Sequence, residues 1–196
     1  MRLKKDFYRC DALTAAQELL GQVIVRRIDG TEIRVKIVET EAYLGAEDKA
    51  CHAYKNKRTS RTETMFAAGG TAYIYLIYGM HSLFNVVVND KNIPEAVLIR
   101  AVEPISGLDI IKNKRDIKSD RVKDLTNGPG KLSQALDIDR EWDGYNLISG
   151  DELYLEAGDR KEHEIVSAKR VNIDYAEEDK DKLWRFYLKD NSFVSQ

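Results

Sequence analysis

An alternating pattern interrupted by Asp29-Gly30 places the strongest constraint on how this 196-residue chain can fold. On either side of the dipeptide, the segments QVIVRRI and TEIRVKIVETEAY alternate apolar and polar residues with the period of a β-strand. Asp-Gly favours the two-residue turn of an antiparallel hairpin, because that turn needs positive φ angles at both positions. The sequence therefore predicts a hairpin over residues 22–43.

Strand patterns outnumber helical ones along the rest of the chain. Helices are predicted over residues 11–22, where Thr14 and Gln17 fit a capping box, in parts of 106–125, and from the Gly-Pro-Gly at 128–130 onward. Strands are predicted over 73–88, as a second hairpin, and over 95–104, 152–158, 165–173 and 183–188. Since hairpins join neighbouring strands, we expect one α+β domain, residues 1–196, with an antiparallel sheet.

The charge balance excludes a protein that is basic over its whole surface, because 31 Lys and Arg are matched by 33 Asp and Glu. A nucleic-acid partner would therefore need a local cluster of positive charge. The two cysteines do not form a CxxC pair or a disulfide framework. No stretch has the apolar core of a signal peptide or the length of a membrane span. We expect a cytoplasmic protein.

Two carboxylates end the apolar face of the strand that follows Asp29-Gly30. If the register is unbroken, one face carries, in order, Ile33, Val35, Ile37, Glu39, Glu41 and Tyr43. A carboxylate at the end of an apolar face is partly removed from water, which suits a general base. The alternative, on spacing alone, is a pair of glutamates in solvated salt bridges.

A metal site is a second interpretation of this region. Glu41, Asp48 and His52 could supply ligands, but no two of them have the close spacing of a metal-binding motif. A lone histidine is more often a structural hydrogen-bonding residue. The sequence therefore favours a site without a metal.

Two polar segments have the composition of a phosphate-binding surface. The segment KNKRTSR carries Lys57, Arg58 and Arg61 among hydroxyl and amide donors, with no acidic residue between them. NGPGK combines Lys131 with the amides of a helix start. Each segment could equally be an ordinary solvated loop or turn.

The second hairpin, YIYLIYGMHSLFNVVV, has an unusual tip. Tyr78, Met80 and His81 stand where a turn usually carries small polar residues. Alternation along the first strand places Tyr73 and Tyr75 on one face, so that Tyr75 points inward as part of a pocket wall. The alternative is that these tyrosines are ordinary aromatic residues of a sheet.

Two polar residues interrupt apolar strands near this hairpin. Asn85 lies within SLFNVVV and Arg100 within AVLIRAV, and each would need a partner when buried. With the tyrosines and glutamates, they describe an aromatic pocket that holds a carboxylate and an arginine.

Six motifs, in this order along roughly residues 8–188, resemble the alkyladenine DNA glycosylase family, the 3-methyladenine DNA glycosylases of the mammalian alkylpurine type. They are LLGQVIVRR, IVETEAYLGAEDKACH, MFAAGGTAYIYLIYGMHSLFNVV, VLIRAVEP, GPGKLSQAL and RVNIDYA. The resemblance implies a curved antiparallel sheet like that of the C-terminal domain of formyltransferases, flanked by short helices. The compact chain without a long basic N-terminal tail is typical of a bacterial member.

The resemblance also implies an activity. Members flip a damaged purine out of duplex DNA and hydrolyse its N-glycosidic bond, the first step of base excision repair. Glu41 matches the base that activates water for attack on C1′, and Arg100 matches the arginine that positions this water. The residues that contact the flipped base would be Tyr43, His52, Tyr75 and Asn85, with Asn85 restricting bases that carry a guanine-type amine.

On the DNA side, Tyr78 matches the wedge that fills the gap left by the flipped nucleotide, flanked by Met80 and His81. The backbone contacts would come from Lys57, Arg58, Arg61 and Lys131. The implied enzyme is monofunctional and monomeric, needs no metal or other cofactor, and associates with the nucleoid through DNA. Its expected substrates are 3-methyladenine, 7-methylguanine, hypoxanthine and ethenoadenine, without a ranking.

Two departures from the family pattern concern the wedge and the pocket rim. His81 stands where some members have an aromatic residue, and residues 89–97 form a longer connection. Two alternatives stay open at this point: a non-catalytic module that binds damaged DNA, and a hydrolase of free nucleosides. Glu41 and Arg100 argue against the first alternative, and the tip with KNKRTSR argues against the second.

Overall fold

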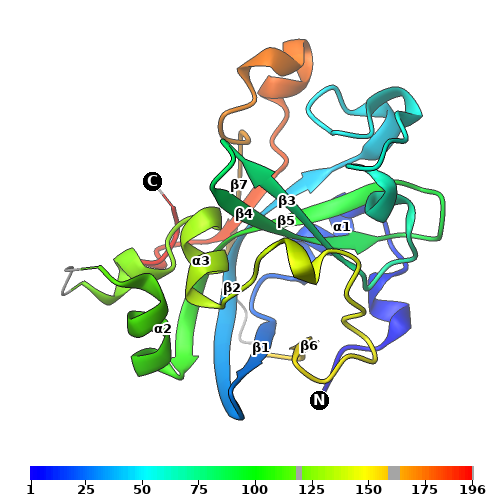
Figure 1. Ribbon diagram of the computed structural model, residues 1–196. Helices are drawn as coiled ribbons and strands as arrows, with labels where there is room; N and C mark the ends of the chain where they lie inside the picture. Colours follow the sequence, from blue (N-terminus) through cyan, green and yellow to red (C-terminus); the bar gives the residue numbers. More distant parts are fainter. Residues whose placement is uncertain (118–120, 159–163, 196) are drawn as a thin grey trace.

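The fold is an α+β arrangement built on a curled, eight-stranded antiparallel sheet, as a computed structural model of residues 1–117, 121–158 and 164–195 describes it (Figure 1). The main path of the sheet is β3-β4-β5-β2-β1-β6, and β8 pairs with both β2 and β7. The strands are β1 (Val23–Ile28), β2 (Thr31–Tyr43), β3 (Ala72–Ile77), β4 (His81–Val88), β5 (Glu95–Ser106), β6 (Leu153–Glu156), β7 (Ile165–Ala168) and β8 (Arg185–Leu188). The predicted antiparallel α+β fold is confirmed.

Short helices cover the sheet. The α-helices are α1 (Ala12–Glu18), α2 (Leu108–Arg115) and α3 (Pro129–Ala135). The 3-10 turns are Lys5–Tyr8, Gly45–Glu47, Tyr54–Asn56, Glu63–Phe66, Val122–Leu125, Arg140–Trp142 and Asp174–Asp181. Helix α1 packs on β2 and β5, and α3 packs on β4 and β5 with α2 beside it. Within the described residues, no helix has the length and apolar character needed to cross a membrane.

The hairpin predicted from Asp29-Gly30 is confirmed. Ile28 pairs with Thr31, so the two residues between them form the whole turn. Asp29 and Gly30 have φ angles of 49° and 77°, as a two-residue turn of this hand requires. The second predicted hairpin also forms, with Ile77 opposite His81 across the tip.

The predicted capping box of the first helix is wrong. The N-cap is Asp11, whose Oδ1 accepts hydrogen bonds from the backbone N–H groups of Leu13 and Thr14. Thr14 lies inside the helix, and its hydroxyl donates to Asp11 Oδ2. A carboxylate directly before the first helical residue satisfies the free amides better than a hydroxyl one turn later.

The assignment of one face to the long strand depended on an unbroken register, and the register is broken. Ile37 lies opposite Val102 and Glu39 opposite Ala101, so Val38 is an extra residue in β2. Thr40 then lies opposite Ile99, which makes Arg100 an extra residue in β5. These two bulges compensate each other, and β-bulges change the direction in which side chains point.

The bulges separate the apolar and acidic parts of β2. Ile33, Val35 and Ile37 pack into the main core, and after the bulge Val38 and Ala42 do so as well. The carboxylates therefore leave the face predicted for them and point away from the core. This change of face positions the candidate site described below.

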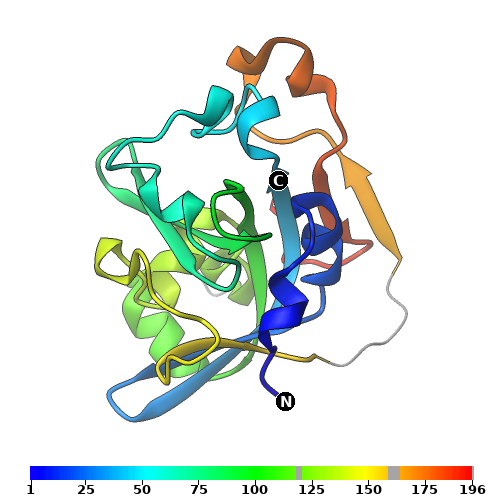
Figure 2. The same ribbon diagram turned by 90° about the vertical axis from the view of Figure 1, so that its right-hand side faces the viewer.

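Two loop regions rise side by side at one end of the sheet, residues 44–66 and residues 169–182 (Figures 1 and 2). A buried ion pair joins them, because Arg170 donates to both carboxylate oxygens of Asp48 at 2.6 and 2.8 Å. The Arg170 guanidinium also lies over the rings of Tyr43 and Trp184, at 4.8 and 4.9 Å. The two loops are thus fixed relative to each other and to the end of β2.

We predict that Arg170→Ala lowers the free energy of unfolding by about 3–5 kcal/mol, because it leaves the Asp48 carboxylate buried without a cation. Lys169→Ala is the matched control, since Lys169 pairs with Asp181 at the surface and should change the value by less than about 1 kcal/mol. Urea denaturation of both variants measures the difference. Similar losses in the two would contradict a structural role for the buried pair.

Candidate functional site

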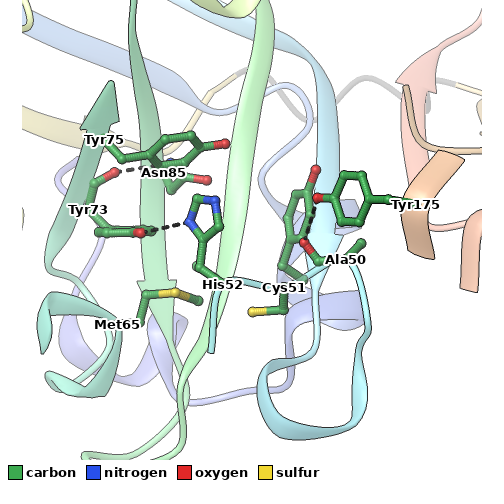
Figure 3. Close-up of a pocket in the computed structure, with 10 residues that line it drawn as sticks. Ala50, Cys51, His52, Met65, Tyr73, Tyr75, Asn85 and Tyr175 are labelled. Atoms are coloured by element: carbon green, nitrogen blue, oxygen red, sulfur yellow. Dashed lines mark hydrogen bonds between the residues drawn. The ribbon is translucent and has the colours of Figure 1, made fainter. Parts of the chain in front are cut away.

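A cleft of about 720 Å³ lies between the end of β2, the tip of the β3–β4 hairpin, the start of α3 and residues 171–175. A smaller pocket shares four of its lining residues with this cleft: Tyr43, His52, Tyr75 and Tyr175. Figure 3 shows Tyr73, Tyr75 and His52 on one side of the smaller pocket and Tyr175 on the other. The residues predicted to contact a base therefore meet in one place.

Glu41 lines the cleft with a fully buried side chain. Its Oε1 accepts a hydrogen bond from the backbone N–H of Val171 at 2.7 Å and faces Arg100 Nη1 at 3.2 Å. Its Oε2 accepts from the hydroxyl of Tyr43 at 2.9 Å. Among the described residues, Oε2 accepts this one hydrogen bond, so it can accept another from a further donor such as water.

Arg100 stands between two buried carboxylates. Its Nε donates to Glu39 Oε1 at 2.8 Å, while Nη1 pairs with Glu41. Burial lowers the pKa of the guanidinium, but Glu41 and Glu39 outweigh that effect and raise the pKa above its usual value. The cation is permanent, and together with Arg185, which also pairs with Glu39, it balances the acidic end of β2.

His52 lies edge-on to Tyr75, with ring centroids 4.5 Å apart. Arg61 Nη2 donates to His52 Nε2 at 3.1 Å, which leaves Nδ1–H to donate to the hydroxyl of Tyr73 at 2.9 Å. Burial and the nearby charge of Arg61 lower the pKa of the imidazole to about 4. His52 is therefore uncharged at neutral pH.

Asn85 is buried at the same pocket. Its Nδ2 donates to the carbonyl groups of Tyr73 and Leu83, at 3.1 and 3.2 Å. Both amide protons are therefore used in fixing the side chain. The amide therefore holds one orientation at the pocket wall.

The tip of the hairpin is exposed. The side chain of Tyr78 is 82% accessible and that of Met80 is 72% accessible. Tyr78 and His81 line the cleft, whereas Met80 lines a neighbouring groove that it shares with His81. His81 packs closely on Gly130, where a Cβ atom would stand 3.2 Å from the histidine Cβ. The tip thus rests against the start of α3.

The predicted phosphate-binding residues do not all reach the cleft. Arg61 and Lys131 line it. Arg58 instead pairs with Glu63 through two nitrogens and lies over the ring of Phe66, and Lys57 is exposed outside the cleft lining. The segment KNKRTSR is therefore split between the cleft wall and the outer surface.

The weaker metal interpretation finds no support. Asp48 is bound to Arg170 instead of standing beside Glu41 and His52. Across the described ranges, no group of three or more His, Cys, Asp or Glu side chains could hold a metal ion.

Sequence reasoning missed several residues of the site. Tyr175 lines both the cleft and the pocket, and Val171 contributes only its backbone N–H. Arg115, at the end of α2, lines the cleft, and its buried Nε has no hydrogen-bond partner among the described residues. The motif RVNIDYA contains Val171 and Tyr175, but nothing in its residue types distinguishes a pocket wall from a loop.

Comparison with known proteins identifies a matching family and similar bacterial proteins. The family model for methylpurine-DNA glycosylase (MPG) matches residues 6–192. A protein of Natranaerobius thermophilus named "Putative 3-methyladenine DNA glycosylase" is 56% identical over 196 residues, covering 100% of this chain and 99% of its own. Proteins of the same name from Clostridium perfringens and Borreliella burgdorferi are 50% and 52% identical, and each comparison covers at least 99% of both chains.

We predict that His52 stays neutral down to about pH 5, because its pKa is about 4. Between pH 6.5 and pH 4, His52 binds a proton in the unfolded chain but not in the folded chain. The free energy of unfolding therefore decreases as the pH falls from 6.5 to 4. One pKa unit corresponds to about 1.4 kcal/mol, so the loss reaches roughly 3 kcal/mol. NMR titration of the imidazole tests the pKa, and His52→Gln should reduce this pH dependence. Titration of His52 near pH 6.5 would contradict the argument.

Proposed function

The chain belongs to the methylpurine-DNA glycosylase family, and we propose that it flips alkylated or deaminated purines out of duplex DNA and hydrolyses their N-glycosidic bonds. Its function as a DNA glycosylase that acts in the repair of alkylated bases follows from the family. The range of bases, the flipping step and the residue roles are the proposal. The observation that carries it is that Glu41, Arg100, an aromatic pocket and the exposed Tyr78 meet in one cleft.

The pocket suits a flat and positively charged base. Aromatic rings attract cations through their faces, and alkylation at N3 or N7 leaves a purine positively charged. Tyr43, Tyr75 and Tyr175 supply these rings. Because His52 is neutral, it does not repel such a base. Neutral hypoxanthine lacks this attraction and needs protonation as it leaves.

Bond cleavage uses the carboxylate of Glu41. As the base departs with the bonding electrons, positive charge develops on the sugar, and a nearby anion stabilises it. A water molecule at the free acceptor site of Oε2 attacks C1′ and gives its proton to Glu41. Arg100 pairs with this carboxylate and orients the water. Water is the nucleophile throughout, so no lysine adduct and no strand cleavage follow.

The duplex is held open by the hairpin tip. Tyr78 enters the stack in place of the flipped nucleotide, where its ring replaces lost base stacking. Met80 and His81 lie beside it in the minor groove. Support comes from the exposure of Tyr78 and from the contact of His81 with Gly130, which braces the tip on α3.

The DNA backbone is bound by cations at the cleft, Arg61, Arg115 and Lys131, with Lys57 outside it. Arg58 contributes less, because Glu63 already neutralises it. The cleft is complete within one chain, so we propose that the enzyme acts as a monomer.

We predict that Glu41→Gln lowers single-turnover base release by about 10²- to 10⁴-fold, the usual contribution of a general base. The test uses duplexes with one hypoxanthine or one 7-methylguanine, with wild type beside the variant. Binding to a duplex with an abasic-site analogue is the control and should be unchanged. Excision by the variant at the wild-type rate would overturn the role of Glu41.

The same assay separates the remaining candidates. Tight binding by wild type without release of either base would indicate a non-catalytic module for damaged DNA. Release of 7-methylguanine but not hypoxanthine would restrict the substrates to cationic bases.

We predict that Tyr78→Ala weakens binding to damaged duplex by about 10- to 100-fold, since one aromatic stack on a base is worth about 1–3 kcal/mol. Tyr78→Phe keeps the ring and should bind like wild type. Fluorescence anisotropy with labelled duplex measures the duplex affinity of both variants. Their affinity for free base is measured for comparison. Equal losses for duplex and free base would contradict a wedge.

A further inference from the structure

Behind Arg100 lies a buried carboxylate to which the proposed chemistry assigns no role, Glu39. Its side chain has no exposed surface and accepts four hydrogen bonds. Oε1 accepts from Arg100 Nε at 2.8 Å, from Arg185 Nη1 at 3.1 Å and from the hydroxyl of Ser195 at 2.8 Å. Oε2 accepts from the backbone N–H of Ser195 at 2.6 Å.

Ser195 connects Glu39 to Arg100 a second time. Its hydroxyl donates to Glu39 and accepts from Arg100 Nη2 at 3.1 Å. The last described residue of the chain thus reaches the guanidinium at Nη2, whereas Glu41 faces Nη1. Through these hydrogen bonds Ser195 contacts β2, the strand that carries both glutamates.

This arrangement fixes two corners of the guanidinium. Nε is bound to Glu39 and Nη2 to Ser195, so only Nη1 faces Glu41. Without these contacts Arg100 could turn both terminal nitrogens toward Glu41 and form a bidentate ion pair. Such a pair would occupy the acceptor sites that a water needs.

We propose that Glu39 and Ser195 are positioning residues that hold Arg100 in a monodentate ion pair with Glu41. The Glu41 carboxylate then keeps an acceptor site for water. This inference rests on the proposed function of Glu41 and Arg100. It adds a structural requirement at the far end of the chain, about 95 residues from Arg100 in sequence.

The Ser195 hydroxyl is not needed to anchor the C-terminal segment. The C-terminal segment has other anchors: Asn191 donates to Glu103 at 2.9 Å, and Phe193 packs against the main core. Removing one hydroxyl therefore leaves the segment attached. The hydrogen bonds that are lost are those of the hydroxyl with Arg100 and Glu39.

The test begins with Ser195→Ala. We expect single-turnover base release to fall by about tenfold, the order expected for one hydrogen bond to a charged group. Binding to the abasic-site duplex and the melting temperature should stay close to wild type. Ser195→Thr keeps the hydroxyl and should restore the rate. Ser192→Ala makes the same chemical change on an exposed side chain and serves as the control.

A second readout does not depend on activity. In wild type, the Nε–H of Arg100 should exchange slowly with solvent, and its NMR signal is assigned by its loss in Arg100→Lys. We expect Ser195→Ala to speed this exchange by about tenfold. Unchanged release or unchanged exchange in Ser195→Ala would overturn the proposal.

The two readouts separate the two hypotheses. If wild type releases no base, the proposed function fails, while the exchange of Arg100 Nε–H still decides whether Ser195 holds the guanidinium. If Glu41→Gln abolishes release and Ser195→Ala does not slow it, the function stands and the positioning role fails.

Discussion

The contact of one buried arginine with two buried carboxylates governs the rest of the site. Removing a carboxylate from water costs several kcal/mol, and a cation recovers this cost only with good geometry and further hydrogen bonds. Arg100 meets both Glu39 and Glu41, and backbone or hydroxyl donors satisfy the remaining oxygens. The paired bulges bring these side chains to one face. Two of the three register shifts between β2 and β5 lie where these charges are buried, and the third lies between Arg34 and Val35.

Local chemistry explains which parts of the fold were predictable. The Asp29-Gly30 turn depends on two adjacent residues, and the start of α3 on a proline at its first position, so both could be recognised in the sequence. The bulges depend on two strands about 60 residues apart, and alternation in either strand gives no sign of them. The face assigned to Glu39 and Glu41 was wrong for this reason.

The same distinction holds for the site. The tyrosines of β3 could be assigned to a pocket wall because alternation fixes their direction. Val171 acts through a backbone N–H, a group that almost every residue has, so its type gives no signal. Ser195 and Tyr175 reach the site from segments that pack on β2 only in the folded chain. The type of a residue predicts the chemistry of its side chain. Long-range packing determines which backbone groups lie at the site.

Net charge is the clearest case of a property that the fold redistributes. The chain carries a formal charge of −2, which argues against a basic DNA-binding protein. Within the described residues, however, Glu41 is the only carboxylate that lines the cleft, beside the cations Arg61, Arg100, Arg115 and Lys131. Other acids are paired outside it, such as Glu177 and Glu178 with Lys49. Since phosphate binding depends on charge within about one Debye length, the local excess of cations decides where an anionic backbone binds.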